Sequence, residues 1–243
     1  EGDALSEWVA ALEGAGCRVR RRVLTQSAQI TRECDLDALI TSHEKKRVRE
    51  LGRCERKMQR EYGEDVSWRR ARGGRDDESG VVDMWRAYKT EVWPRTWQYA
   101  YLQKQDAAAR ENNLAYLDSI ITRAADNGSL DVSLLFLGTR PIAGCVGFVY
   151  GTTLWLMSAS FDGEFRKYSP GLILYRNVIL DSQSRGDELI DFGGESFDWK
   201  QQWAERRTPL YQIEAGLGGF HGLLWRLRAW LDAVRGKEAS PAL

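Results

Sequence analysis

The sequence contains few of the residues that metal sites and catalytic triads use. Of 243 residues, two are histidines, His43 and His221, and four are cysteines without CxxC spacing. A zinc site and a disulfide framework are therefore disfavoured. We expect no metal, reduced thiols and a cytoplasmic location.

Long apolar runs and net charge are also missing. The sequence has no run of about 18 apolar residues and no signal peptide, so it predicts no transmembrane segment. The 35 basic and 35 acidic residues cancel, which argues against a DNA-binding protein. The chain begins at Glu1 rather than Met, and we expect an N-terminal part of the protein to be missing. The sequence does not indicate an oligomeric state.

Helical periodicity dominates the first half of the chain. Asp35 is suited to begin a long basic helix and Gly63 to end it. Asp106 begins another helical pattern, which ends at Asn127 and Gly128. The expected elements are a helix at 4–13, a strand at 17–26, a basic helix at 35–61, a polar loop at 69–80, and helices at 80–93 and 106–126.

From residue 131 the hydrophobic period becomes that of strands. Short polar turns between apolar runs predict an antiparallel meander. The expected fold is α/β, with a mixed, mainly antiparallel sheet flanked by helices. The expected elements are strands at 131–138, 142–151 and 153–162, a helix at 168–186, strands at 188–194 and 209–218, and a C-terminal amphipathic helix.

The start of the 168–186 helix carries Ser, Pro and Gly in a row. We expect the Ser169 hydroxyl to cap the helix, Pro170 to occupy its first turn and Gly171 to leave space beside the backbone. Free N–H groups at a helix start beside a strand end can bind an anion, such as the pyrophosphate of an acyl-CoA. The alternative is an ordinary helix start that binds nothing. The predicted donor site comprises Ser169, Gly171 and Leu172, together with Arg166 from the preceding loop.

Several short motifs resemble those of a known family. They are "RPIA" at 140–143, "YSPG" at 168–171, "DFGG" at 191–194, and "WK" with a downstream Trp at 199–203. In this order they resemble the acetyltransferase domain of the CelD-like branch of GNAT N-acyltransferases, which is related to the Fem peptidoglycan aminoacyltransferases. The resemblance covers roughly residues 40–215.

This resemblance implies a GNAT-like fold and an incomplete N-terminal half, because such proteins usually carry two tandem GNAT-like halves. Residues 1–34 are then a remnant of the first half or a linker, and 35–128 a helical region with the basic helix. Residues 129–219 form the GNAT-like catalytic core, and 220–243 a C-terminal amphipathic helix. In the family the middle strands splay apart and the donor's pantetheine pairs with an exposed strand edge.

Three residues are candidates for acid–base work in acyl transfer. Asp191 lies within an apolar strand, where a carboxylate needs a partner or a function. It either orients or deprotonates the acceptor, or it has a structural role, capping the next turn or pairing with an arginine. Glu195 is a second candidate base, with a solvated loop charge as the alternative. Tyr168 is a candidate acid for the leaving thiolate, or a packing residue.

Three features are candidates for substrate contacts. By its resemblance to Fem-type relatives, Lys200 is expected to contact an anionic substrate or donor, although it could be a surface lysine. Trp199 is expected to form the pocket wall or the core. The basic helix is either a solvated helix with ion pairs or a docking face for an anionic polymer or tRNA-borne donor.

The resemblance implies an acyl-CoA-dependent N-acyltransferase acting on an amino group of a small molecule or saccharide, without a metal. A cell-envelope or exopolysaccharide setting fits that family. One alternative is a Fem-like aminoacyltransferase that uses aminoacyl-tRNA. Another is a catalytically inactive GNAT-like binding module.

Overall fold

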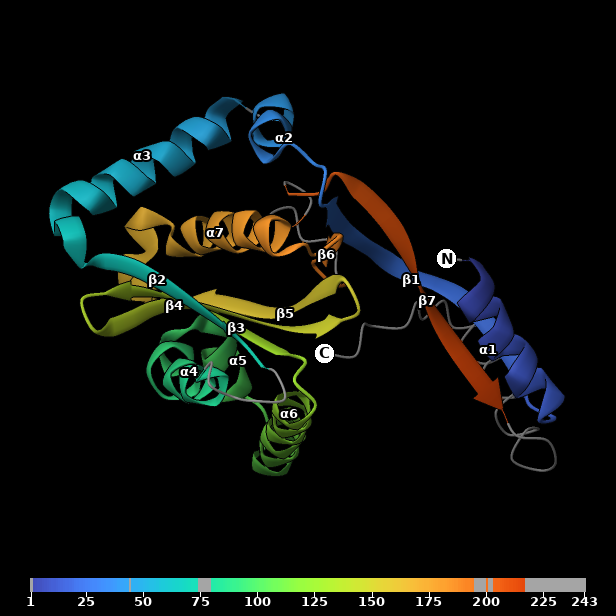
Figure 1. Ribbon diagram of the computed structural model, residues 1–243. Helices are drawn as coiled ribbons and strands as arrows, with labels where there is room; N and C mark the ends of the chain where they lie inside the picture. The colour runs from blue at the N-terminus through green and yellow to red at the C-terminus, as the bar shows by residue number, and fades with distance from the viewer. Residues whose placement is uncertain (1, 44, 74–79, 195–199, 201–202, 217–243) are drawn as a thin grey trace. The chain divides into compact units, whose positions relative to one another are not determined.

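The computed structural model describes residues 2–43, 45–73, 80–194, 200 and 203–216 (Figure 1). The chain divides into two compact units, one of residues 27–208 and one of residues 1–26 with 209–243. The predicted C-terminal helix at 220–243, Glu195 and Trp199 lie outside the described residues.

Seven strands form one sheet in the order β2-β3-β4-β5-β6-β1-β7. Neighbours from β2 to β5 are antiparallel, β5 and β6 are parallel, and β6 and β1 are antiparallel. This mixed, mainly antiparallel sheet confirms the predicted α/β fold. The strands are β1 (Arg18–Thr31), β2 (Val66–Arg72), β3 (Leu130–Leu137), β4 (Arg140–Tyr150), β5 (Thr153–Phe161), β6 (Leu189–Asp191) and β7 (Arg206–Gly216).

Side chains cap two of the helices at the predicted positions. Asp35 accepts from the Ala38 N–H at 2.9 Å, and Asp106 accepts from the Ala109 N–H at 2.9 Å. The helices are α1 (Gly2–Gly14), α2 (Leu36–His43), α3 (Lys45–Tyr62), α4 (Val81–Ala87), α5 (Trp97–Leu102), α6 (Ala107–Asp126) and α7 (Pro170–Arg185). Short 3-10 or π turns connect them: η1 (Gly63–Asp65), η2 (Tyr88–Val92), η3 (Trp93–Arg95) and η4 (Gly163–Tyr168).

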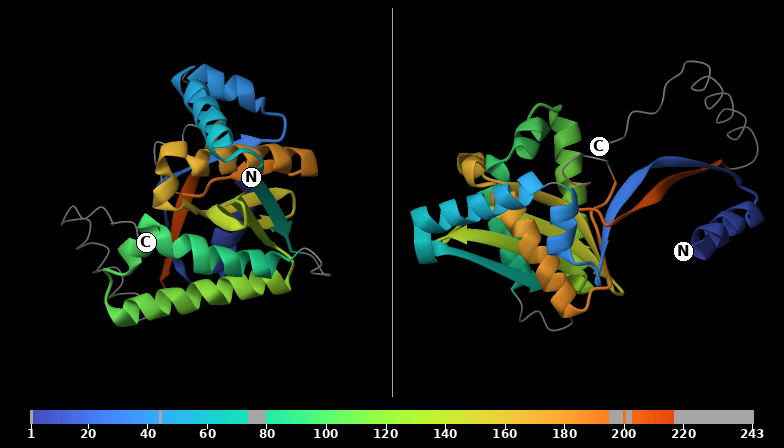
Figure 2. Two further views of the ribbon diagram at one scale, coloured as in Figure 1. Left: turned by 90° about the vertical axis from the view of Figure 1, so that its left-hand side faces the viewer. Right: turned by 90° about the horizontal axis from the view of Figure 1, so that it is seen from above.

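Helices cover both faces of the sheet in the 27–208 unit (Figures 1 and 2). On one face α7 packs on the strands, and α3 lies outside α7 in both views. On the other face lie α4, α5 and α6. The second face requires a glycine, because a Cβ on Gly144 would lie 2.2 Å from Cδ2 of the buried Tyr88.

One of the predicted elements was wrong. Residues 69–72 belong to β2, not to a loop, because Arg70 and Arg72 bind buried carboxylates and Ala71 between them packs in the core. The helix expected at 35–61 is described as α2 and α3, on either side of residue 44.

The smaller unit contains α1, the first part of β1 and the last part of β7. Arg22 Nε donates to Gln212 Oε1 at 2.9 Å, and the Arg21 guanidinium lies 3.6 Å from the centre of the Tyr211 ring. These contacts join the two strand segments.

Candidate functional site

The pairing between β5 and β6 is short. It runs from Thr153 opposite Leu189 to Trp155 opposite Asp191. After β6, the Phe192 N–H donates to Ala28 O at 2.9 Å, so the chain turns toward β1. Within the described ranges no strand pairs with residues 157–161 of β5 on this side. Such an edge can pair with an extended ligand.

A bulge marks the point where the two strands part. Val146 of β4 pairs with Ser158, but Gly147 pairs with Leu156, so Met157 is an extra residue on β5. A bulge bends a strand and increases its twist. Gly147 lets β4 and β5 approach closely at the bulge, because a Cβ at this position would lie 2.6 Å from Trp155 O. Trp155 and Met157 are both exposed.

The start of α7 lies at the far end of this open edge. Ser169 has the expected N-cap position, but the predicted hydroxyl cap was wrong. Its φ of 49° places the residue in the left-handed region, and its carbonyl oxygen accepts from Leu172 and Ile173 at 3.0 and 3.3 Å. In this conformation the Ser169 hydroxyl does not accept from the helix N–H groups, and the Ser169 carbonyl oxygen caps them instead.

One amide at this start is available for a ligand. Pro170 has no N–H, and among the described residues nothing accepts from the Gly171 N–H. A Cβ on Gly171 would lie 3.2 Å from Cδ1 of Phe161, so glycine also makes room for that ring. Leu172 is half-buried against the core, and Arg166 is exposed.

Tyr168 joins the α7 start to α3. Its ring is buried and edge-on to Tyr62, with centroids 5.6 Å apart. Its hydroxyl donates to Glu61, and Lys167 Nζ donates to the same carboxylate at 3.3 Å. Burial and the Glu61 hydrogen bond raise the pKa of Tyr168 to about 12, and the Tyr168 hydrogen bond lowers the pKa of Glu61.

Asp191 is completely buried and its oxygens already accept hydrogen bonds. Oδ1 accepts from Ser27 Oγ and from the Gly193 N–H at 2.7 Å, and Oδ2 accepts from Gln29 Nε2 at 2.6 Å. Of the two readings of Asp191, these contacts match the structural one, in which it caps the turn after its strand. No arginine partner appears among the described residues.

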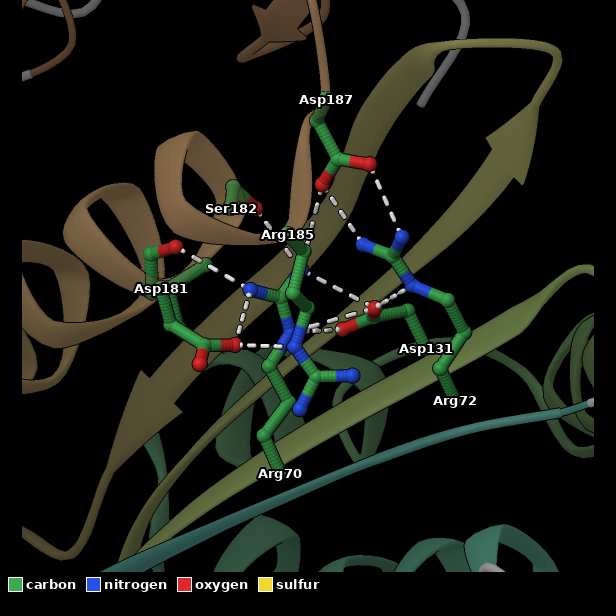
Figure 3. Close-up of polar contacts among 8 residues, drawn as sticks. Arg70, Arg72, Asp131, Asp181, Ser182, Arg185 and Asp187 are labelled. Carbon is green, nitrogen blue, oxygen red and sulfur yellow. Dashed lines mark hydrogen bonds and ion pairs between the residues drawn. The ribbon is translucent and has the colours of Figure 1, made fainter.

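The sequence analysis missed a buried charge network that holds the other end of α7 (Figure 3). Arg70 binds Asp131 in a fork at 2.9 and 3.0 Å, and Asp181 at 3.0 Å. Arg72 binds Asp131 at 2.8 Å and Asp187 at 2.8 and 2.7 Å. The signal in the sequence was the alternation of "RRAR" inside an apolar context, which we interpreted as a loop.

The structure brings some predicted site residues together and separates others. Arg166, Tyr168, Ser169 and Gly171 gather at the α7 start. Asp191 lies opposite Trp155, which is six residues before the end of β5. Asp191 is therefore separated from that end of β5 by about 20 Å along the strand. Near Asp191, Lys200 Nζ donates to Gly194 O at 2.9 Å.

Three further observations concern the side chains and helices of the described residues. None of their His, Cys, Asp and Glu side chains forms a group of three or more that could hold a metal ion. None of the described helices is both long and apolar enough to cross a membrane. All four cysteines are free thiols.

Comparisons with known proteins agree with this architecture. Residues 45–201 match the family described as "Acetyltransferase (GNAT) domain". None of the curated proteins matches the sequence.

Three solved structures are similar at low identity. FemX aligns with a TM-score of 0.55 at 10% identity, over 93% of this chain and 71% of its own. A protein of unknown function from Bacteroides thetaiotaomicron aligns with a TM-score of 0.51 at 13% identity, over 88% and 67%. L-PGS from Bacillus licheniformis aligns with a TM-score of 0.47 at 11% identity, over 95% and 71%. At these identities the likeness concerns the fold alone.

Proposed function

Because this chain belongs to the GNAT acetyltransferase-domain family, we propose that it transfers an acyl group from acyl-CoA to an amino group of a small molecule or saccharide. The observation that carries the proposal is the open edge of β5, with the free Gly171 N–H at one end and the bulge at Met157 at the other. A donor with a phosphate group and a long extended arm fits an anion site and an open strand edge about 16 Å long.

The α7 start supplies the contacts that we propose for the donor pyrophosphate. These are the Gly171 N–H, the helix dipole of the 16-residue α7, and the exposed side chain of Arg166. Ser169 and Leu172 complete this donor site by shaping the first turn. The extended part of the donor then runs along residues 157–161 of β5.

Direct attack of the acceptor nitrogen on the thioester carbon would release a thiolate and require removal of an ammonium proton. The hydrogen bonds on Asp191 favour a positioning role for it at the end of β6. We therefore propose Glu195, which follows Gly193 and Gly194 in the sequence, as the base. Tyr168 could act as the acid only if its hydroxyl left Glu61. Lys200 and Trp199 are proposed for the acceptor side.

Binding of acetyl-CoA tests the proposal, with Gly171→Asp and Gly171→Asn as matched variants. Both side chains bring the same Cβ to 3.2 Å from the Phe161 ring, so the two variants share that packing cost and differ in charge, and only the Asp charge repels a pyrophosphate. We expect acetyl-CoA to raise the melting temperature of the wild type, to raise it less in Gly171→Asn, and to have no effect in Gly171→Asp. If acetyl-CoA, CoA and longer acyl-CoAs all leave the wild-type melting temperature unchanged, the proposal is wrong and an inactive module is favoured.

An aminoacyl-tRNA donor is the second candidate, because α3 presents a basic hollow beside the α7 start. A tRNA donor would neutralise several phosphates at once, so its affinity would fall steeply with salt. Binding of a charged tRNA in the absence of acyl-CoA binding would favour this donor.

A further inference from the structure

A hollow on the outer side of α3 is lined by basic side chains. Its lining residues are Arg53, Arg56, Lys57, Arg60 and Glu61. The opposite side of the helix carries Leu51, Cys54 and Met58, which are buried in the core. The helix therefore has one side that packs and one side that presents positive charge.

Three of these cations form no ion pair among the described residues, although Lys57 lies close enough to Glu61 for their charges to attract. Arg53 is paired with Glu50, and Glu61 is engaged by Tyr168 and Lys167. For Arg56, Lys57 and Arg60, the part of the chain that the structure describes offers no carboxylate within ion-pair distance. Like charges on neighbouring helix positions repel one another, and an anion between them would relieve that repulsion.

The hollow adjoins the start of α7. Lys57 Nζ, which lines the hollow, lies 5.3 Å from the centre of the ring of Tyr168, the residue before Ser169. Glu61, which lines the hollow, accepts the Tyr168 hydroxyl. A ligand group in the hollow would therefore lie close to any anion held at the Gly171 N–H.

We propose that this hollow binds the 3′-phosphate of the CoA portion of the donor; the inference rests on the proposed function. CoA carries its pyrophosphate and a separate phosphate monoester on the ribose, so two anion sites at a short distance match the molecule. A phosphate monoester has a charge of about −1.5 to −2 and three acceptor oxygens, which suit several guanidinium and ammonium groups. The hollow thus distinguishes CoA from donors that lack this phosphate.

Dephospho-CoA, which lacks only the 3′-phosphate, is the direct probe. We expect wild-type protein to bind CoA about 10-fold more tightly than dephospho-CoA at low salt, because exposed charge pairs contribute modestly and add up. The double variant Lys57→Ala, Arg60→Ala should bind the two ligands equally, and its affinity for dephospho-CoA should match that of wild type. Calorimetric titration of both proteins with both ligands gives the four constants.

Gln59→Ala is the matched control, because Gln59 is an exposed and uncharged residue on the same helix. It should preserve the wild-type ratio, and the melting temperatures of all variants should be similar. Equal wild-type affinities for CoA and dephospho-CoA would overturn the inference while leaving the acyltransferase proposal intact. An equal loss for both ligands in the double variant would also overturn it. If neither ligand binds, the proposed function fails and this assignment fails with it.

Discussion

Replacing Arg70 by Met should destabilise the protein severely. The Arg70 side chain is 1% exposed and its partner Asp131 3%. Its guanidinium donates to Asp131, Asp181, Val178 O and Ser182 Oγ. The change therefore removes the hydrogen bonds from Arg70 to all four acceptors. Breaking a buried ion pair on one side costs about 3–5 kcal/mol, because the remaining charge stays buried.

The magnitude depends on what remains of the network. After the change, Asp131 retains only Arg72, at 2.8 Å, and Arg72 is shared with Asp187. We therefore expect the lower half of the range, about 3–4 kcal/mol. A change of 1 kcal/mol shifts the melting temperature of a domain of this size by about 2–4 °C, so the expected fall is about 6–16 °C.

Denaturant unfolding followed by circular dichroism measures this loss directly. Arg86→Ala is the control, because Arg86 and Asp83 form an ion pair in which both side chains are mostly exposed, and it should change stability by less than about 0.5 kcal/mol. A loss below 1 kcal/mol in Arg70→Met would refute the reasoning, since the network would then contribute no more than a surface pair.

Three further changes test individual residues. Asp191→Asn should lower the free energy of unfolding by about 1–3 kcal/mol and also lower turnover, because the new amide N–H₂ group would face the donors Ser27 and Gln29. A variant with full stability but no turnover would instead indicate that Asp191 is the base. Burial raises the pKa of Asp187, but the hydrogen bonds and charge of Arg72 outweigh it and the pKa lies below its usual value. The stabilisation of the folded state by ionised Asp187 is therefore complete above about pH 4 and is lost as the pH falls below it. In Asp187→Asn, the free energy of unfolding measured in urea should depend less on pH between pH 5 and pH 2 than in wild type. Lys200→Ala should raise the Michaelis constant for the acceptor or donor, and kinetics identical to wild type would leave it a structural contact of Gly194.

The sequence predicted most of the fold because its periods are clear. Polar turns separate the apolar runs that form β3, β4 and β5, and Gly138 and Gly151 have the positive φ that those turns need. It failed at β2, where arginines inside a strand resemble a loop. Their burial is possible only because Asp131 and Asp187 lie opposite, and these residues are far away in the sequence.

The candidate site was predictable only in part. The "SPG" start and the glycine at 171 could be located from local chemistry. The left-handed φ of Ser169 and the engagement of Asp191 could not, because each depends on tertiary contacts with α3 and β1. The position of α3 beside Tyr168 likewise depends on Glu61 and Tyr62, and no periodicity reveals it.

The place of β1 in the sheet has a consequence for biosynthesis. This strand is synthesised well before its neighbours β6 and β7, which follow it only after more than 150 further residues. At ordinary elongation rates it waits on the order of 10–30 s for Leu189 to follow Thr31. During that interval its backbone has neither neighbour, so nascent chains are exposed to mispairing and would benefit from a chaperone.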